Sequence, residues 1–125
     1  MSRIFAFLRG LLGLKSCANA QTDSIKTVDA SEFAEIIKSD SVTLVDVRTA
    51  DEYAAGHIGK AVNMDVLKSD FKYRVGELPK DKKVAVYCRS GKRSLVAANT
   101  LAKLGYKVIN LRGGWLEWEQ YTHKK

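Results

Sequence analysis

A cysteine followed by a cluster of basic residues is the feature of this sequence with the clearest chemical potential. Cys88 comes directly after the apolar run 84–87, and the six residues that begin with it include Arg89, Lys92 and Arg93 but no acid. Nearby cations stabilise the thiolate form of a cysteine, and the thiolate is the nucleophile. The spacing therefore predicts that Cys88 is a nucleophile for an anionic substrate.

The alternative interpretation of Cys88 is a buried, inert thiol at the end of a core strand. Free cysteines are often buried, which favours that interpretation for an arbitrary cysteine. Here nearly all of the next six residues are polar or basic, and an apolar pocket does not accommodate such groups without partners. We therefore favour the nucleophile.

The segments on either side of Cys88 predict how the thiol is positioned. A β-branched run precedes it, a short loop follows, and a helical pattern begins at Ser94. In parallel α/β sheets, ligands bind beyond the carboxyl ends of the strands. Gly91 allows the loop a positive φ, and the N–H groups of the loop and of the helix N-terminus form an anion site.

Strand-like and helical patterns alternate along the chain. The strand-like runs are residues 25–28, 42–47, 61–64, 84–87 and 106–111. The helical patterns begin at the caps Asp29 and Thr49, continue through 65–78 and 94–104, and end around Trp115 and Trp118. This alternation predicts a parallel sheet with helices on both faces. The run 42–47 is nearly all apolar, as in a central strand that is buried on both faces.

Two short patterns predict helix starts. Asp29 precedes Glu32 by three residues and Thr49 precedes Glu52 by three, which is the spacing of a capping box. Val28 and Phe33 flank the first cap as a hydrophobic staple. Gly56 and Gly105 predict the ends of two helices.

Length and composition indicate one globular domain. The chain has 125 residues, of which 46% are hydrophobic and 28% charged. The net charge is +7, but no basic stripe is interleaved with aromatic residues, which argues against nucleic acid binding. The two cysteines, Cys17 and Cys88, form neither a CxxC motif nor a Cys/His cluster, so we expect no metal site.

The first 22 residues differ from the rest of the chain. They carry Arg3, Arg9 and Lys15 without an acid, and contain a short apolar stretch and the pattern Ala-Asn-Ala at 18–20. A secretory signal has this organisation, whereas lipidation at Cys17 and a transit peptide are alternatives. We expect residues 1–22 to be an export signal or a flexible N-terminal segment and 23–125 to be the folded domain. Cleavage would make the protein periplasmic or secreted, and without cleavage we expect it to be cytoplasmic.

Three segments together resemble the rhodanese homology domain, and the similarity spans about residues 25–121. The segments are Asp46-Val47-Arg48 with Glu52-Tyr53, Gly56-His57-Ile58 and Ala61-Val62-Asn63; Cys88-Arg89-Ser90-Gly91-Lys92-Arg93-Ser94; and Leu111-Arg112-Gly113-Gly114-Trp115. The resemblance implies an α/β fold with a five-stranded parallel sheet flanked by helices on both faces. It also implies transfer of sulfane sulfur through a cysteine persulfide, in a protein with a single copy of the domain.

The same resemblance implies a role for each loop residue. Cys88 would be the catalytic residue that holds the persulfide. The substrate-binding residues would be Arg89, Ser90, Gly91, Lys92 and Arg93, whose N–H groups surround the outer sulfur and whose cations attract the donor. The activity would be that of a thiosulfate sulfurtransferase, with cyanide, a thiol or a protein as sulfur acceptor. We expect a monomer that needs no cofactor.

Two other functions are compatible with these residues. One is a sulfur-relay or anion-binding module without turnover, and the other is a phosphatase or arsenate reductase on the same fold. Cysteine phosphatases have the loop Cys-x5-Arg, whereas Arg93 makes this loop Cys-x4-Arg. The shorter loop favours sulfur over phosphate.

The other conspicuous polar and aromatic residues have structural interpretations. Asp46 and Arg48 end a predicted strand and are expected to fix the neighbouring loop by charge-assisted hydrogen bonds. His57 follows a glycine that ends a predicted helix, so we interpret it as stabilising a turn. Trp115 and Trp118 are expected to pack against the core. The stretch 49–52 supplies no cation, unlike the corresponding stretch of some tandem rhodaneses.

Overall fold

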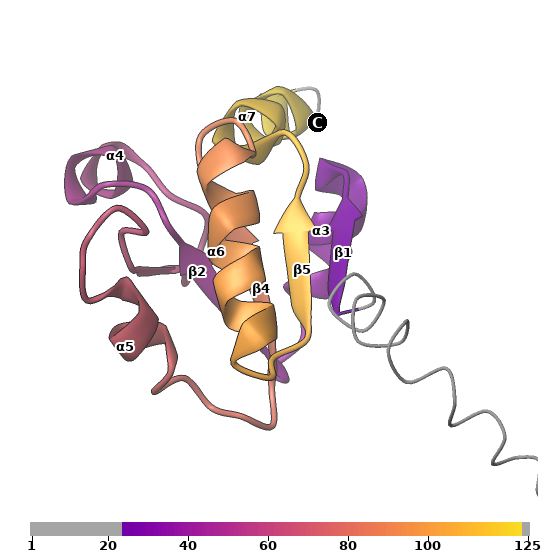
Figure 1. The fold of residues 1–125 in the computed structure, drawn as a ribbon. Coiled ribbons are helices and arrows are strands. Elements are labelled where there is room, and N and C mark those ends of the chain that lie inside the picture. The colour runs from indigo at the N-terminus through magenta and orange to yellow at the C-terminus, as the bar shows by residue number, and fades with distance from the viewer. Residues whose placement is uncertain (1–23, 124–125) are drawn as a thin grey trace, which may run out of the picture.

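Five parallel strands form the sheet at the centre of the molecule (Figure 1). The structure, a computed structural model, describes residues 24–123. The strands are β1 (Ile25–Val28), β2 (Val42–Asp46), β3 (Val62–Asn63), β4 (Lys83–Tyr87) and β5 (Val108–Leu111), in the order β1-β5-β4-β2-β3. Each neighbouring pair is parallel, which confirms the predicted sheet. The export signal predicted within residues 1–22 lies outside the described residues.

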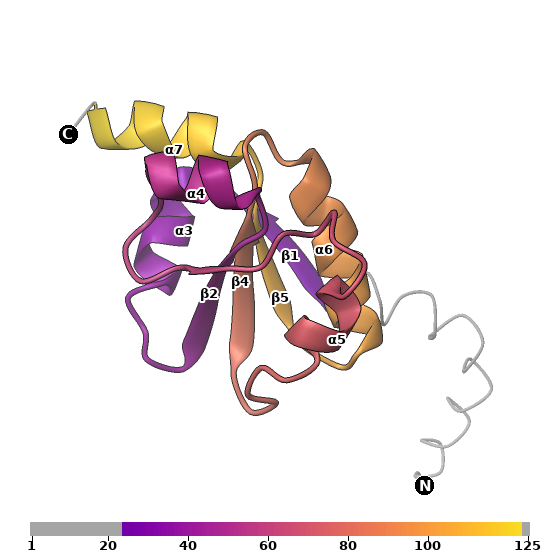
Figure 2. The same ribbon diagram turned by 90° about the vertical axis from the view of Figure 1, so that its left-hand side faces the viewer.

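Helices cover both faces of the sheet, as the alternating pattern predicts (Figure 2). The helices are α3 (Ala30–Ile36), α4 (Ala50–Ala55), α5 (Phe71–Val75), α6 (Lys92–Lys103) and α7 (Gly114–His123). α5 and α6 pack on one face, and α3, α4 and α7 on the other. Side chains of β4 alternate between the two cores, with Val86 on the α6 side and Ala85 on the α3 side. Across residues 24–123, none of the helices has the length and apolar character needed to span a membrane.

The predicted helix caps are present because they depend on residues close together in the chain. The Asp29 carboxylate accepts the Glu32 N–H at 2.9 Å. At the start of α4, Thr49 and Glu52 form a complete capping box. The capping box expected at Asp29 is only half present, because the Glu32 carboxylate pairs with Lys26 across an exposed surface.

Two of the predicted helix boundaries are wrong. The helix expected over 65–78 is only the five residues of α5, because the backbone N–H groups of Met64 and Val66 bond to carbonyls at the end of β2 instead. The Asp65 side chain also accepts the Leu67 N–H, which makes a turn. The next helix, α6, begins at Lys92 and not at Ser94, because Gly91 serves as its N-cap.

The prediction that β2 is central and buried on both faces is correct for its last two residues only. β3 pairs with Val45 and Asp46 and leaves Val42–Leu44 at a half-buried edge. β4 and β5 are the strands that have neighbours on both sides along most of their length. Cys88 therefore follows one of the two inner, buried strands of the sheet.

Candidate active site

Cys88 follows β4 at the carboxyl edge of the sheet, where α6 begins. The residue is 1% exposed, and its side chain faces the core beneath α6. Its Sγ accepts the Gly91 N–H at 3.1 Å and lies 3.5 Å from Ser94 Oγ. The Ser94 hydroxyl donates to the Gly91 carbonyl at 3.2 Å, and its hydrogen can rotate toward the sulfur when Cys88 is ionised. Residues 88–94, called the cysteine loop below, therefore surround the sulfur with hydrogen-bond donors.

These donors favour the thiolate form of Cys88. Burial raises the pKa of the thiol, because it disfavours the charged form. Hydrogen bonds from the Ser94 side chain and from the N–H groups of Ser94, Gly91 and Ser90 lower it further than burial raises it. The pKa of Cys88 consequently lies below its ordinary value, in the direction that the loop sequence predicts.

Two glycines allow the cysteine loop to fold tightly against the segment that follows β5. Gly91 has φ 104°, and a Cβ atom there would collide with the Arg112 carbonyl oxygen. Gly114 has φ 61°, and its Cβ would lie 2.5 Å from the Cys88 carbonyl oxygen. Both positions need a residue without a side chain.

The N-terminus of α7 fixes the carbonyl groups of the cysteine loop. The Trp115 N–H donates to the Cys88 carbonyl at 2.8 Å, and the Leu116 N–H donates to the Arg89 carbonyl at 3.1 Å. These two bonds hold the Cys88 and Arg89 carbonyl groups against the N-terminus of α7. The N–H groups of the loop are left to face the sulfur.

The buried ion pair after β2 supports the same edge of the sheet. Arg48 binds the Asp46 carboxylate at 2.7 Å, and both side chains are almost fully buried. Arg48 also donates to the Gly56 carbonyl at 2.6 Å and stacks on the Trp115 ring, 4.9 Å from its centre. This confirms the structural interpretation of Asp46 and Arg48.

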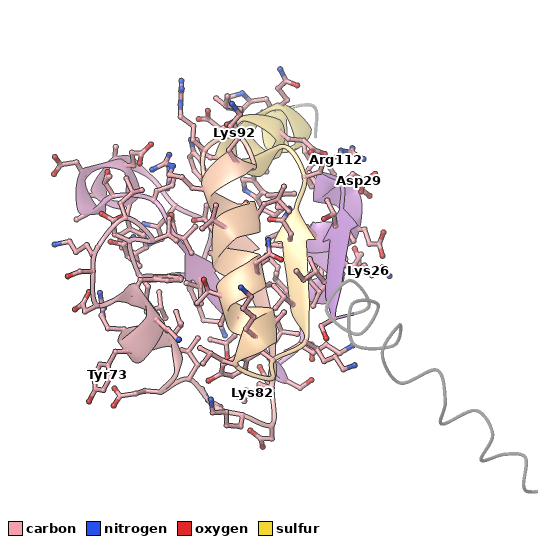
Figure 3. The ribbon with its side chains drawn as sticks, in the orientation of Figure 1. Lys26, Asp29, Tyr73, Lys82, Lys92 and Arg112 are labelled. Atoms are coloured by element: carbon pink, nitrogen blue, oxygen red, sulfur yellow. The ribbon has the colours of Figure 1, made fainter. Side chains whose placement is uncertain are left out.

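The three cations of the cysteine loop have different surroundings. Arg89 and Lys92 are exposed, and Figure 3 shows Lys92 at the end of the molecule where α6 begins. Arg93 is half-buried, and its two terminal nitrogens bind the two Glu52 oxygens at 2.8 and 3.0 Å. Hydrogen bonding to Arg93 is the main reason that the pKa of Glu52 falls to about 2.

The other residues singled out in the sequence have structural partners. The His57 ring stacks on Tyr53, with 3.8 Å between ring centres, and its Nδ1 lies 2.9 Å from the Tyr53 carbonyl oxygen. Trp115 and Trp118 pack against the core on the α3 side. These contacts agree with the structural interpretations of all three residues. No three His, Cys, Asp or Glu side chains within residues 24–123 are grouped so as to hold a metal.

Two residues of the site, Ser94 and Glu52, were not predicted to take part in it. Ser94 was expected only to start a helix, although a hydroxyl six positions after a cysteine, inside the following helix, is a signal that could have been read. Glu52 was expected only to cap α4. Its partner Arg93 is 41 residues away, so no local pattern reveals the pair.

Comparisons with known proteins agree with this geometry. The model of the rhodanese-like domain matches residues 29–121. A sulfurtransferase of Allochromatium vinosum is 36% identical over 99 residues, which are 78% of this chain and 91% of that protein. The Bacillus subtilis protein YrkF, named as a candidate sulfur carrier, is 34% identical over 88% of this chain and 58% of its own length. A rhodanese-related protein of Thermoplasma volcanium has a similar structure, with a TM-score of 0.69 and 31% identity over 77% of this chain and 92% of that one.

Proposed function

The chain belongs to the rhodanese-like domain family, and from this membership we propose that it is a sulfurtransferase that carries sulfur as a persulfide on Cys88. The observation that carries the proposal is the cysteine loop, in which a thiol of lowered pKa receives hydrogen bonds at the N-terminus of a 12-residue helix. The Gly91 and Ser94 contacts are directed at the sulfur itself. A negatively charged sulfur is therefore the species that the loop stabilises best.

The reaction would have two steps. The Cys88 thiolate attacks the sulfane sulfur of a thiosulfate-like donor and forms a new S–S bond, while the old S–S bond breaks and its electron pair leaves with sulfite. An acceptor such as cyanide or a thiolate then attacks the outer sulfur of the persulfide. Thiocyanate or a new persulfide leaves, and the Cys88 thiolate is regenerated. Neither step needs a cofactor.

The residues of the cysteine loop would have different roles in binding the donor and the transferred sulfur. The N–H groups of residues 89–93 would stabilise the outer sulfur, which bears the negative charge of the persulfide. Arg89 and Lys92 are exposed and would attract the anionic donor. Arg93 is paired with Glu52, so its contribution to donor binding would be reduced.

A sulfur relay without rapid turnover is the second candidate. Two observations favour it: Cys88 is only 1% exposed, and the similar protein YrkF is named as a candidate sulfur carrier. In that case Cys88 would still accept a sulfur atom, but it would pass the atom on only to a partner protein.

Persulfide formation and turnover distinguish the two candidates. Incubation with thiosulfate should add the mass of one sulfur atom to the intact protein, and Cys88→Ser should abolish the addition. Sustained thiocyanate production from thiosulfate and cyanide supports the sulfurtransferase, whereas a stable persulfide without turnover supports the relay. Activity that persists in Cys88→Ser would refute both.

Hydrolysis of aryl phosphates should be absent. The loop Cys-x4-Arg is one residue shorter than the phosphatase loop, and the Arg93 fork that would clamp phosphate is occupied by Glu52. Displacing a reacting group by about 1 Å can slow a reaction on the order of a hundredfold. Phosphatase activity that depends on Cys88 would contradict this interpretation of the loop.

A further inference from the structure

The ion pair between Glu52 and Arg93 joins α4 to the first turn of α6, beside the cysteine loop. Both guanidinium nitrogens of the fork bind the carboxylate, and the two side chains are 25% and 29% exposed. Glu52 Oε1 also accepts hydrogen bonds from the N–H and the hydroxyl of Thr49. The carboxylate is thus held in place from both sides while part of the pair remains open to solvent.

Arg93 is the partly buried cation of the cysteine loop. Its hydrogen bond to Glu52 is the main cause that raises its pKa, and the negative charges of Glu52, Cys88 and Asp65 raise it further, so these groups lie within electrostatic reach of Arg93. With Cys88 ionised, the trio of Cys88, Glu52 and Arg93 carries a net charge of −1. Because Glu52 neutralises Arg93, the exposed Arg89 and Lys92 are the cations of the cysteine loop that remain to attract a donor anion.

We propose that Glu52 determines which sulfur donors the site accepts, by disfavouring doubly charged donors relative to singly charged ones. The proposal rests on the sulfurtransferase function and deepens it by naming the donor class. A dianion such as thiosulfate is repelled twice as strongly by a given charge as a monoanion. A donor with a single negative charge, such as an organic persulfide or a thiosulfonate, therefore fits this site better.

Thiosulfate and methanethiosulfonate are a matched pair of probes for this proposal. Each presents a sulfane sulfur bonded to an oxidised sulfur atom, but the first has two negative charges and the second has one. The Cys88 thiolate forms the same new S–S bond with both. The electron pair of the broken S–S bond leaves with sulfite from thiosulfate and with methanesulfinate from methanethiosulfonate.

Glu52→Gln removes the negative charge and keeps a side-chain oxygen that can accept hydrogen bonds from Thr49. The ratio of kcat/KM for thiosulfate to kcat/KM for methanethiosulfonate should rise on the order of tenfold, through a lower KM for thiosulfate. Glu52→Asp keeps the charge and should retain a ratio close to that of the wild type. Glu32→Gln breaks the exposed pair with Lys26 on α3 and should leave the ratio unchanged.

A merely structural role for Glu52 gives a different result. Loss of a structural contact would lower kcat/KM for both donors by the same factor, and an unchanged ratio in Glu52→Gln would overturn the proposal. If Glu52→Gln does not fold, Glu52→Asp still tests the proposal. This variant keeps the charge, so a ratio that differs clearly from that of the wild type would also overturn it.

A second measurement does not depend on sulfur transfer. Sulfate and methanesulfonate are unreactive anions with two charges and one, and each can protect Cys88 from alkylation by iodoacetamide. In Glu52→Gln, sulfate should protect at a concentration about tenfold lower than in the wild type, while methanesulfonate should change less. Equal changes for the two anions would refute the charge selectivity, whereas failure of turnover alone would refute only the proposed function.

Discussion

The loops that follow β2 and β4 leave adjacent strands at the same edge of the sheet, yet different forces hold them. Asp46 and Tyr87, the last residues of the two strands, are partners in register. The loop after β2 is fixed by side-chain charges, since Arg48 binds both Asp46 and the Gly56 carbonyl in a buried setting. The cysteine loop is fixed by backbone contacts, through two glycines and the N–H groups of α7.

This difference shows that two neighbouring loops at one edge of the sheet have different roles. The loop after β2 is structural, and the cysteine loop holds the reactive sulfur. After β2, the opposite charges neutralise each other and are almost fully buried, so they have no capacity left for a ligand. After β4, the carbonyls are bonded to α7, whereas the N–H groups and two exposed cations remain directed at the sulfur or at solvent. The pair of Glu52 and Arg93 connects the two loops, and it is intermediate in burial.

The largest effect should come from breaking the buried ion pair between Asp46 and Arg48. Asp46→Ala leaves the Arg48 guanidinium buried without its partner, and breaking a buried ion pair in this way costs about 3–5 kcal/mol of stability. Urea denaturation of the full chain measures this change. The matched control is Lys26→Ala, which breaks an exposed pair with Glu32 and should cost less than about 1 kcal/mol. Equal effects of the two substitutions would contradict the division between the loops.

The second largest effect should come from the backbone of the cysteine loop. Gly91→Ala places a Cβ against the Arg112 carbonyl and requires a positive φ, so the loop must shift away from Cys88. A shift of about 1 Å should reduce sulfur transfer on the order of a hundredfold. Stopped-flow measurement of persulfide formation tests this expectation.

Gly105→Ala is the control for the Gly91 substitution. Gly105 has φ 99°, close to that of Gly91, but a Cβ there would meet nothing within 4 Å. The control should therefore lose some stability and keep its rate of sulfur transfer. A similar loss of rate in both variants would show that backbone strain, and not the collision with the Arg112 carbonyl, explains the effect.

The same contrast explains which features could be predicted from the sequence. The Thr49 cap and the positive φ of Gly91 depend on a few neighbouring residues, and both were predicted correctly. The helix predicted over 65–78 failed because Met64 and Val66 bond to the end of β2, a tertiary contact that a local periodicity does not contain. The hydrogen bonds that Arg93 donates to Glu52 were missed for the same reason.

A smaller effect is expected at Ser94, and pH reveals it. The hydrogen bond from the Ser94 hydroxyl lowers the pKa of Cys88, so Ser94→Ala should raise that pKa. The rate of alkylation by iodoacetamide rises with pH as the thiolate forms. The variant should therefore react more slowly than the wild type at pH values between the two midpoints, and equally fast above both.

Thr100→Ala is the control for Ser94→Ala. Its hydroxyl donates to the Val96 carbonyl of α6, as that of Ser94 donates to the Gly91 carbonyl, but the Thr100 bond is exposed. The alkylation profile of this control should match that of the wild type. A shift of the Ser94→Ala profile to lower pH would contradict the assigned hydrogen bond.

The smallest effect should come from the exposed cations. Lys92→Ala and Arg89→Ala each remove a solvated charge, and exposed charges contribute about 0.2–1 kcal/mol to an interaction, so kcat/KM for thiosulfate should fall by no more than about fivefold. High salt should remove most of the difference from the wild type, because it screens exposed charges. Lys82→Ala, at the opposite end of the molecule in Figure 3, should have no effect. A loss as large as that expected for Gly91→Ala would mean that side-chain charge, and not the backbone of the cysteine loop, holds the donor, and the contrast between the two loops would no longer stand.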